Sequence, residues 1–203
     1  MSRITCKKCR RIGESLCGRE KCAYKKRPYA PGKLDSDRKH KSNRSEYGLQ
    51  MLQKQKVRHS YGTSEKQFSS YVMRAIANKD KTKTPAGVLY ESLESRLDNV
   101  VYRGGLAHVR ALARQMVAHG HILVNGKRVL SASHSVRVED VVGVRAGSKS
   151  SALFVHSHDK LKSFKAPNWL KLDSDKLEIT VKGKATDIEP SFDLASVLEF
   201  YSR

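Results

Sequence analysis

Four cysteines lie within the first 22 positions of this 203-residue chain, and the rest of the chain contains none. They form two short-spaced pairs, because two residues separate Cys6 from Cys9 and four separate Cys17 from Cys22. Each pair can present two thiolates along one edge of a tetrahedron, the geometry that structural zinc sites adopt. Four sulfur ligands leave no open position for a reacting water. We expect one structural zinc ion on these cysteines, with an iron–sulfur cluster or unligated redox thiols as alternatives.

Arginines with helical spacing form a second group of candidate site residues, between Glu91 and Val129. The second of two expected helices, residues 107–118, carries Arg110 and Arg114 four positions apart, so both guanidinium groups lie on one face. The opposite face carries apolar residues at core-facing spacing: Val109, Leu112, Ala113, Met116 and Val117. A unit that buries one face and presents guanidinium groups on the other suits a structured polyanion.

Turn signals frame the strand that follows these helices. Gly120 is expected to end the second helix in the left-handed conformation. The strand 121–124 leads into Asn125-Gly126, the residue pair best suited to a two-residue type I′ turn. These signals predict a small αα-β module.

The charge of the chain identifies a class of partner. Lys and Arg number 40 against 20 Asp and Glu, which gives a net charge of +20 and a sequence pI of about 10.0. Such an excess favours nucleic acid, because neutralising phosphates releases condensed counterions. An acidic membrane surface is the competing partner. No apolar run reaches the ~18–20 residues of a spanning helix, and neither a signal peptide nor a lipidation motif is recognisable. We therefore expect a cytoplasmic protein with no membrane partner and no small-molecule substrate.

Composition and periodicity divide the chain into segments and predict an α+β fold. Residues 1–45 form a zinc knuckle and a basic extended segment, and residues 46–90 form a helical domain in which Ser64 is an expected N-cap. Residues 91–149 form the arginine-bearing module, inserted before residues 150–203, which complete the helical domain with strands and loops. The expected C-terminal strands are Ala152–Val155, Leu177–Lys182 and Val197–Tyr201.

Several motifs resemble the bacterial family of small-subunit ribosomal protein four, in its zinc-knuckle form, along nearly the whole chain. They are Arg27-Pro28-Tyr29-Ala30-Pro31-Gly32, Tyr61-Gly62-Thr63-Ser64-Glu65-Lys66-Gln67-Phe68, Leu93-Glu94-Ser95-Arg96-Leu97-Asp98-Asn99-Val100-Val101-Tyr102-Arg103, Trp169-Leu170 and Glu199-Phe200-Tyr201-Ser202-Arg203. The chain departs from the family at Gly104-Gly105, where a bulkier residue is usual at one position. It departs again at Val138-Glu139-Asp140, where the family commonly has Pro-Gly-Asp.

The resemblance implies a structural protein of the small ribosomal subunit, not an enzyme. Family members bind small-subunit ribosomal RNA at a multi-helix junction of the 5′ domain, nucleate assembly and influence decoding accuracy. Their expected partners are small-subunit ribosomal protein five, other neighbouring ribosomal proteins and messenger RNA at its entrance. The resemblance further implies that the protein recognises the shape and the sugar–phosphate backbone of the RNA.

The expected RNA contacts begin with four arginines of the central module. Arg96 and Arg103 flank its first helix, whereas Arg110 and Arg114 line its second. Four arginines on one small surface are better explained by phosphate contacts than by surface ion pairs, although Asp98 is expected to orient one of them. The other expected contacts are Lys7, Lys8, Arg10, Arg11, Lys25, Lys26, Arg27, Tyr29, Arg58, Lys66, His119, Lys127 and Arg128.

Two other functions remain open at this stage. An RNA-modifying enzyme such as a pseudouridine synthase carries a similar arginine-bearing module, but it needs a larger catalytic domain than the 58 residues after Arg145. A free-standing RNA-binding regulator would not need the cysteine-rich segment. Stoichiometric association with small subunits through a high-salt wash would exclude the regulator.

Overall fold

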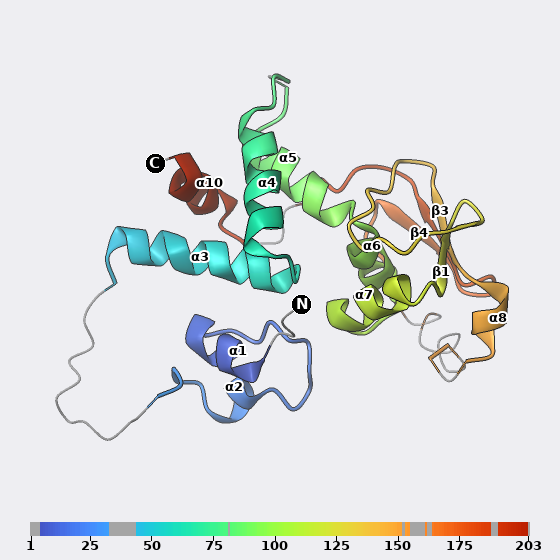
Figure 1. The fold of residues 1–203 in the computed structure, drawn as a ribbon, viewed down its shortest axis with the longest axis horizontal. Helices are drawn as coiled ribbons and strands as arrows, with labels where there is room; N and C mark the ends of the chain where they lie inside the picture. Colours follow the sequence, from blue (N-terminus) through green and yellow to red (C-terminus); the bar gives the residue numbers. More distant parts are fainter. Residues whose placement is uncertain are drawn as a thin grey trace. The chain divides into compact units, whose positions relative to one another are not determined.

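The chain folds into two compact units, Met1–Leu89 with Ile188–Arg203, and Tyr90–Asp187. The structure is a computed structural model that describes residues 5–32, 44–80, 82–151, 153–154, 161, 164–187 and 191–202. Its elements are drawn in Figure 1. Within these residues, helices and one antiparallel sheet make up the fold, as the α+β prediction requires. The boundary between the units falls within helix α5 (Pro85–Glu94), and each unit is described by itself below.

The first unit is helical. Its described elements are α1 (Cys6–Ile12), α2 (Ala23–Lys26), α3 (Glu46–Ser60), α4 (Glu65–Ile76) and α10 (Leu194–Ser202). The predicted N-cap of α4 is confirmed, because the Ser64 hydroxyl accepts a hydrogen bond from the backbone N–H of Gln67 at 3.3 Å. Rings join α10 to α3 and α4: Phe200 stacks on Tyr47 with centroids 5.3 Å apart, and Tyr201 lies 6.3 Å from Phe68.

The C-terminal segment is a helix, so the predicted strand Val197–Tyr201 is wrong. Leu194 and Val197 are buried three residues apart, which is helical spacing. Asp193 caps the helix, since its carboxylate accepts hydrogen bonds from the N–H and hydroxyl of Ser196. These bonds hold the pKa of Asp193 below its usual value. An acidic residue directly before a mixed apolar run is a helix-start signal that the strand interpretation passed over.

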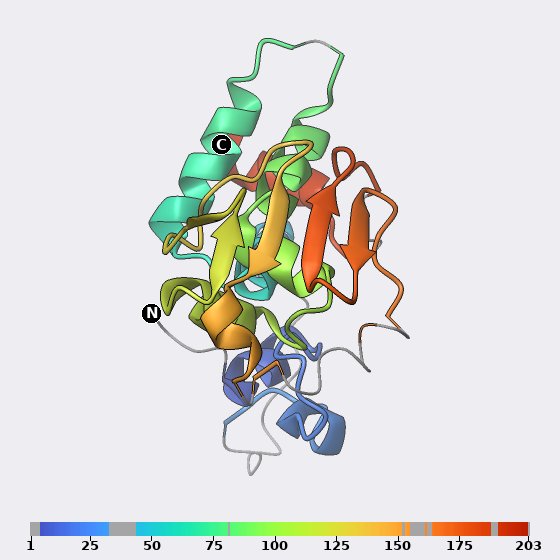
Figure 2. The same ribbon diagram turned by 90° about the vertical axis from the view of Figure 1, so that its right-hand side faces the viewer.

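The second unit packs two helices on a five-stranded sheet. The helices are α6 (Leu97–Arg103) and α7 (Arg110–Ala118), with a short α8 (Ala146–Lys149) after the third strand. The strands are β1 (Ile122–Val124), β2 (Lys127–Arg128), β3 (Val141–Val144), β4 (Leu170–Asp173) and β5 (Glu178–Val181). They lie in the order β2-β1-β3-β5-β4 with every pair antiparallel, and Figure 2 faces this sheet. The helices and the sheet bury one apolar core between them.

The last two strands extend the sheet of the arginine-bearing module. Val142 of β3 pairs with Ile179 of β5, and Leu172 of β4 pairs with the same residue from the other side. The predicted strand at Leu177–Lys182 is thus confirmed, but it lies in the same compact unit as the module. In the predicted strand Ala152–Val155, Leu153 and Phe154 form a turn, while its two end residues lie outside the described part of the chain.

The turn predictions for the module are confirmed. Asn125 and Gly126 have φ values of 49° and 76°, as a type I′ turn requires, and they connect Val124 to its partner Lys127. Gly120 follows α7 with φ 73°, although the helix begins at Arg110 and not at residue 107. Glu139 stands where the resemblance places a glycine, and it keeps a left-handed backbone with φ 74°.

Candidate nucleic-acid interface

Arg96 is buried, so it does not share one surface with the other three arginines as expected, and its contact with RNA stays a prediction. Its guanidinium donates from Nε to Asp98 Oδ1 at 3.0 Å and from Nη2 to Asp98 Oδ2 at 2.7 Å. The two side chains are 1% and 6% exposed. The expected orienting role of Asp98 is confirmed, but a buried two-point ion pair holds Arg96 inside the unit instead of presenting it to a phosphate.

Arg103 also has an acidic partner. Its Nε donates to Glu94 Oε2 at 2.9 Å and its Nη2 donates to Glu94 Oε1 at 3.0 Å. The Glu94 side chain is only 1% exposed and that of Arg103 is 18% exposed. Arg96 and Arg103 thus each face a carboxylate, which reduces the charge that they could offer to a phosphate, and the RNA contacts expected of them stay predictions.

Arg110 contacts an amide and an aromatic ring. Its Nε donates to Asn99 Oδ1 at 2.8 Å, and its guanidinium carbon lies 4.4 Å from the centre of the Tyr102 ring, within cation–π range. Arg114 follows one turn later on α7, and both side chains are half-buried at the unit's surface. The sequence predicts both arginines as contact residues, but nothing in the spacing of residues 93–103 indicates that Asn99 contacts one of them.

The hairpin after α7 brings a second set of predicted residues together. Arg128 Nη2 donates to the carbonyl of His119 at 3.3 Å, and both Lys127 and Arg128 are exposed. Gly120 makes this approach possible, since a Cβ there would lie 2.0 Å from Arg128 Nε. The rings of His119 and His121 stack with centroids 6.1 Å apart.

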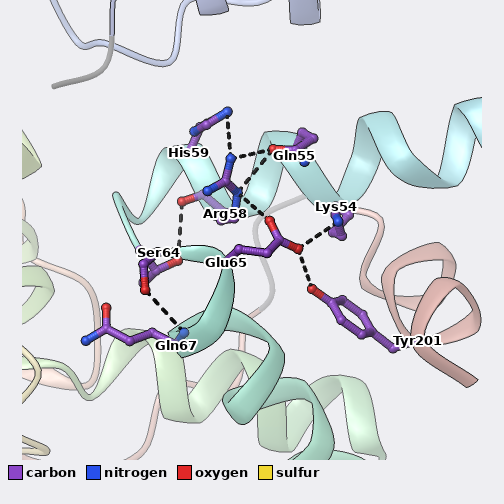
Figure 3. A network of polar contacts seen from close by, with 9 residues as sticks. Lys54, Gln55, Arg58, His59, Ser64, Glu65, Gln67 and Tyr201 are labelled. Carbon is purple, nitrogen blue, oxygen red and sulfur yellow. Dashed lines mark hydrogen bonds and ion pairs between the residues drawn. The ribbon is translucent and has the colours of Figure 1, made fainter. Parts of the chain in front are cut away.

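In the first unit, Glu65 joins three elements around Arg58 (Figure 3). The carboxylate accepts from Lys54 Nζ at 2.7 Å and from the Tyr201 hydroxyl at 3.0 Å, and its other oxygen lies 3.2 Å from Arg58 Nε. Arg58 also donates twice to Gln55 Oε1, at 3.1 and 2.7 Å. The predicted contact residue Arg58 is thereby held rigidly between α3 and α4.

This network shifts the pKa values of three of its members. Burial, followed by the charges of Arg58 and Lys8, lowers the pKa of His59 to about 4, so its ring is neutral at pH 7 and can accept from Arg58 Nη2 at 3.2 Å. Burial tends to raise the pKa of Glu65, but hydrogen bonds from Lys54 and Tyr201 outweigh it and lower the pKa. Burial and the Glu65 carboxylate raise the pKa of Tyr201.

The cysteines of the first unit converge. The sulfur atoms of Cys6, Cys17 and Cys22 lie within 4.8 Å of one another. Cys9 is fully buried, and its thiol is hydrogen-bonded to that of Cys17. Burial raises the pKa of the Cys9 thiol, whereas hydrogen bonds that include one from Ser15 outweigh burial at Cys22 and lower its pKa. Zn–S bonds of ~2.3 Å require tetrahedral sulfurs ~3.8 Å apart, and the sulfurs of Cys6, Cys17 and Cys22 lie near that spacing.

Basic residues surround this cluster on α1, on α2 and just beyond it. Arg10 Nε donates to the carbonyl of Tyr29 at 3.0 Å and its guanidinium lies 4.7 Å from the Tyr29 ring, so two predicted contact residues touch each other. Lys56 of α3 forms an ion pair with Glu14, which joins the cysteine-rich segment to the helical unit. Lys8 is half-buried, and the other predicted contacts are exposed: Lys7, Arg11, Lys25, Lys26, Arg27 and, on α4, Lys66.

Comparison with known proteins covers the whole chain. Residues 2–94 match the model for the ribosomal protein S4/S9 N-terminal domain, and residues 95–142 match the S4 domain. A relative named small ribosomal subunit protein uS4, from Cutibacterium acnes, is 42% identical over 199 residues, 97% of this chain and 96% of the relative. Proteins with the same name from Kosmotoga olearia and Thermotoga maritima are 39% and 40% identical over the full length of both chains. The chain belongs to the uS4 family.

The ranges matched by the uS4 family models cover only part of the second unit. Arg96, Arg103, Arg110 and Arg114 all fall in the S4 domain, whereas Glu94 is the last residue of the N-terminal match. Strands β4 and β5 complete the sheet of the second unit but lie beyond residue 142, outside both matched ranges. Among the described residues, no helix is both long enough and apolar enough to cross a membrane.

Proposed function

We propose that this uS4-family chain is a structural, non-enzymatic constituent of the small ribosomal subunit, and that it binds small-subunit ribosomal RNA in the cytoplasm. The observation that carries the proposal is full-length similarity of about 40% to proteins named small ribosomal subunit protein uS4, together with the S4 domain match. The net charge of +20 supports it, because a protein of this charge gains affinity for RNA by releasing counterions.

The RNA-facing residues of the second unit are proposed to be Arg110 and Arg114 on α7, with Lys127 and Arg128 on β2 and His119 between them. These side chains come from consecutive elements and are exposed or half-buried. Folded RNA holds its phosphates at a set spacing, whereas a flexible strand does not. Guanidinium groups that are fixed on a helix suit phosphates at such a set spacing. Arg96 is left out of this set because its charge is buried against Asp98.

The first unit is proposed to add a second phosphate-binding region. Arg58 stands fixed beside a neutral His59, and Lys8 acts on the same histidine ring electrostatically. The exposed contacts proposed around it are Lys7, Arg11, Lys25, Lys26, Arg27 and Lys66, with Arg10 stacked on Tyr29. Two regions on separate units suit a folded RNA with several helices better than one isolated duplex.

We also propose a structural zinc ion on Cys6, Cys9, Cys17 and Cys22. Three convergent sulfurs and a buried fourth thiol support it. A bound metal supplies no reaction here; it fixes the four side chains, and with them the basic residues of α1 and α2. The segment has few buried apolar residues, so metal-binding energy would be its folding energy.

Finer assignments follow from the resemblance alone. We propose that the RNA target is a multi-helix junction of the 5′ domain and that binding nucleates subunit assembly. We propose further that the chain contacts small-subunit ribosomal protein five and neighbouring ribosomal proteins, and lies beside messenger RNA at its entrance, where it influences decoding accuracy.

A subunit-association experiment tests the proposed function. Tagged chain, expressed at its natural level, should sediment with small subunits in a one-to-one ratio after a high-salt wash. Loss of the chain from washed subunits would contradict the proposal and favour the free-standing regulator. In parallel, replacing Arg110 and Arg114 by Ala should flatten the salt dependence of RNA affinity by about one unit of slope per lost phosphate contact, whereas the matched Lys pair should keep the slope.

A further inference from the structure

Tyr29 holds an aromatic ring at the surface of the first unit, just after a run of basic residues. The residue is 39% exposed, and Lys25, Lys26 and Arg27 before it are exposed as well. A single exposed ring is common on protein surfaces and does not by itself indicate a binding site. Tyr29 differs from such a ring in the way that its neighbours hold it.

Arg10 of α1 contacts Tyr29 at two points. Its Nε donates a hydrogen bond to the Tyr29 backbone carbonyl at 3.0 Å, and its guanidinium carbon lies over the Tyr29 ring, 4.7 Å from the ring centre. The second distance is within cation–π range. Because both contacts join the same two residues, they fix the guanidinium group against one face of the ring.

The backbone around Tyr29 is restricted as well. Pro28 and Pro31 lie on either side of it, and each proline fixes its own φ and restricts the residue before it to extended conformations. The cysteine cluster adds a long-range restraint, because three of its sulfurs lie within 4.8 Å of one another and α1 packs beside α2. A ring that is already ordered loses less conformational entropy when a ligand packs on it.

An aromatic ring held in this way suits a base that is not paired. Unpaired bases of RNA stack on aromatic side chains, whereas the bases inside a duplex already stack on one another. Every base has a flat face, so such stacking tolerates different sequences. The exposed cations at residues 25–27 can at the same time neutralise phosphates next to the base. Ring and charge together favour a single-stranded part of a folded RNA over a duplex.

We propose that Tyr29 is a stacking site for an unpaired RNA base and that Arg10 is the residue that positions its ring. This inference rests on the proposed RNA-binding function and deepens it, because it names the chemical group that this part of the first unit recognises. The ring carries no charge, so the preference that it adds for unpaired bases is separate from the salt-dependent affinity that the basic residues supply.

Variants of Tyr29 in the full-length chain test the stacking site. The probes are a transcript of the 5′ domain of small-subunit ribosomal RNA, whose junctions contain unpaired bases, and a plain RNA duplex of equal length. Tyr29→Leu should weaken binding to the transcript about tenfold, the effect of losing one stacked base, and leave duplex binding within about twofold. The salt slope should not change on either RNA, because no charge is lost. The matched variant Tyr29→Phe keeps the ring and should bind both RNAs as the wild type does.

A double-mutant cycle tests the positioning role of Arg10. Arg10→Lys keeps the charge but loses the planar group and the Nε donor, so it should weaken transcript binding about threefold at an unchanged salt slope. In the Tyr29→Leu background, Arg10→Lys should have no further effect on affinity. Equal losses with and without the ring would overturn the positioning role.

Two features of the design separate a loss of stacking from a folding defect. Tyr29→Leu keeps the backbone carbonyl that accepts from Arg10, and its duplex binding reports whether the basic surface is intact. Ultraviolet crosslinking of the wild-type chain to the transcript needs no variant. Peptides from that complex should carry a nucleotide at Tyr29, and the nucleotide should come from an unpaired position. Crosslinks confined to other residues of the first unit would contradict the stacking site.

The outcomes distinguish this inference from the proposed function. Equal losses on both RNAs from Tyr29→Leu, or no loss on the transcript, would overturn the stacking site. A loss from Tyr29→Phe as large as that from Tyr29→Leu would overturn it too, because the hydroxyl and not the ring would then matter. If the wild-type chain itself shows no preference for the transcript over the duplex, the proposed function fails.

Discussion

Replacing Gly104 by Ala tests the packing of α6 against the sheet. Gly104 follows α6 directly, and a Cβ at this position would lie 2.2 Å from Cδ1 and 2.7 Å from Cγ1 of Ile179 in β5. Ile179 is fully buried in the core, so it has little room to move. The backbone of Gly104 has φ −81°, which any residue adopts, so the expected effect is steric and not conformational.

The size of the effect follows from opposing contributions. Overpacking a well-packed core costs about 1–3 kcal/mol, whereas replacing Gly by Ala in the unfolded chain returns about 0.4–1 kcal/mol. We expect Gly104→Ala to lower the free energy of unfolding by about 1–2 kcal/mol. In a unit of about 100 residues this lowers Tm by roughly 4–8 °C per kcal/mol.

The companion change is Ile179→Val, which removes the Cδ1 atom that the new methyl group would meet. Alone it should cost about 0.5–1.5 kcal/mol through the lost contact. Together the two changes should cost less than their sum by about 1 kcal/mol, because the valine removes the closer of the two clashes with the alanine. Urea unfolding of all four proteins measures this coupling. Additive costs, within about 0.5 kcal/mol, would show that α6 does not pack on β5 as described.

Four further predictions concern other parts of the chain. Glu139→Gly should raise the free energy of unfolding by about 1 kcal/mol, because the φ of 74° at Glu139 is strained for a residue with a side chain but not for glycine. In thermal melts, the control Glu139→Ala should give no such gain. His59 has a pKa of about 4 in the folded chain against an ordinary 6.5, so the unfolded chain binds a proton at this histidine more readily. The free energy of unfolding should therefore fall as the pH drops from about 6.5 to about 4. The variant His59→Gln should show a smaller fall in urea melts over a pH series. Because the folded chain lowers the pKa of Glu65, its ionised carboxylate stabilises the fold above its ordinary pKa, and this stabilisation is lost in acid. Tyr201→Phe removes a hydrogen bond to this carboxylate, so it should lower the free energy of unfolding by about 1 kcal/mol at pH 7 and by less once the carboxyl is protonated. Cys22→Ser should speed proteolysis of the cysteine-rich segment while residues 90–187 remain resistant, and equal cleavage of both parts would contradict a local role for the metal.

Features governed by neighbouring residues could be predicted from the sequence. The type I′ turn at Asn125-Gly126, the helix stop at Gly120 and the N-cap at Ser64 each depend on the chemistry of a few adjacent positions, and each is confirmed. The final helix is harder to predict, because apolar residues at mixed spacing fit both a strand and a helix, and the cap at Asp193 is the local signal that favours the helix. The pairing of β3 with β5 depends on residues more than 30 positions apart, which periodicity cannot identify.

For the candidate site too, groups set by local spacing can be predicted from the sequence, whereas contacts between distant residues cannot. Residue type and spacing predict that the cysteines converge, which the structure shows for Cys6, Cys17 and Cys22, and they place Arg110 and Arg114 together on α7. They did not reveal that Arg96 is buried against Asp98 or that Arg103 faces Glu94, because the partner of a charged group depends on packing. Net charge counts every arginine equally, whereas the structure shows that Arg96 and Arg103 have acidic partners within the unit.

The preference of the chain for folded ribosomal RNA is the most direct test of its proposed role. Filter binding of purified, metal-loaded chain to the 5′-domain transcript and to a duplex of equal length, over a series of salt concentrations, measures it. Tighter binding to the transcript at every salt concentration, with a steep negative salt slope on both RNAs, is the expected result. Equal affinity for the two RNAs would mean that the chain responds only to phosphate charge, and would contradict its role as a specific binder of ribosomal RNA.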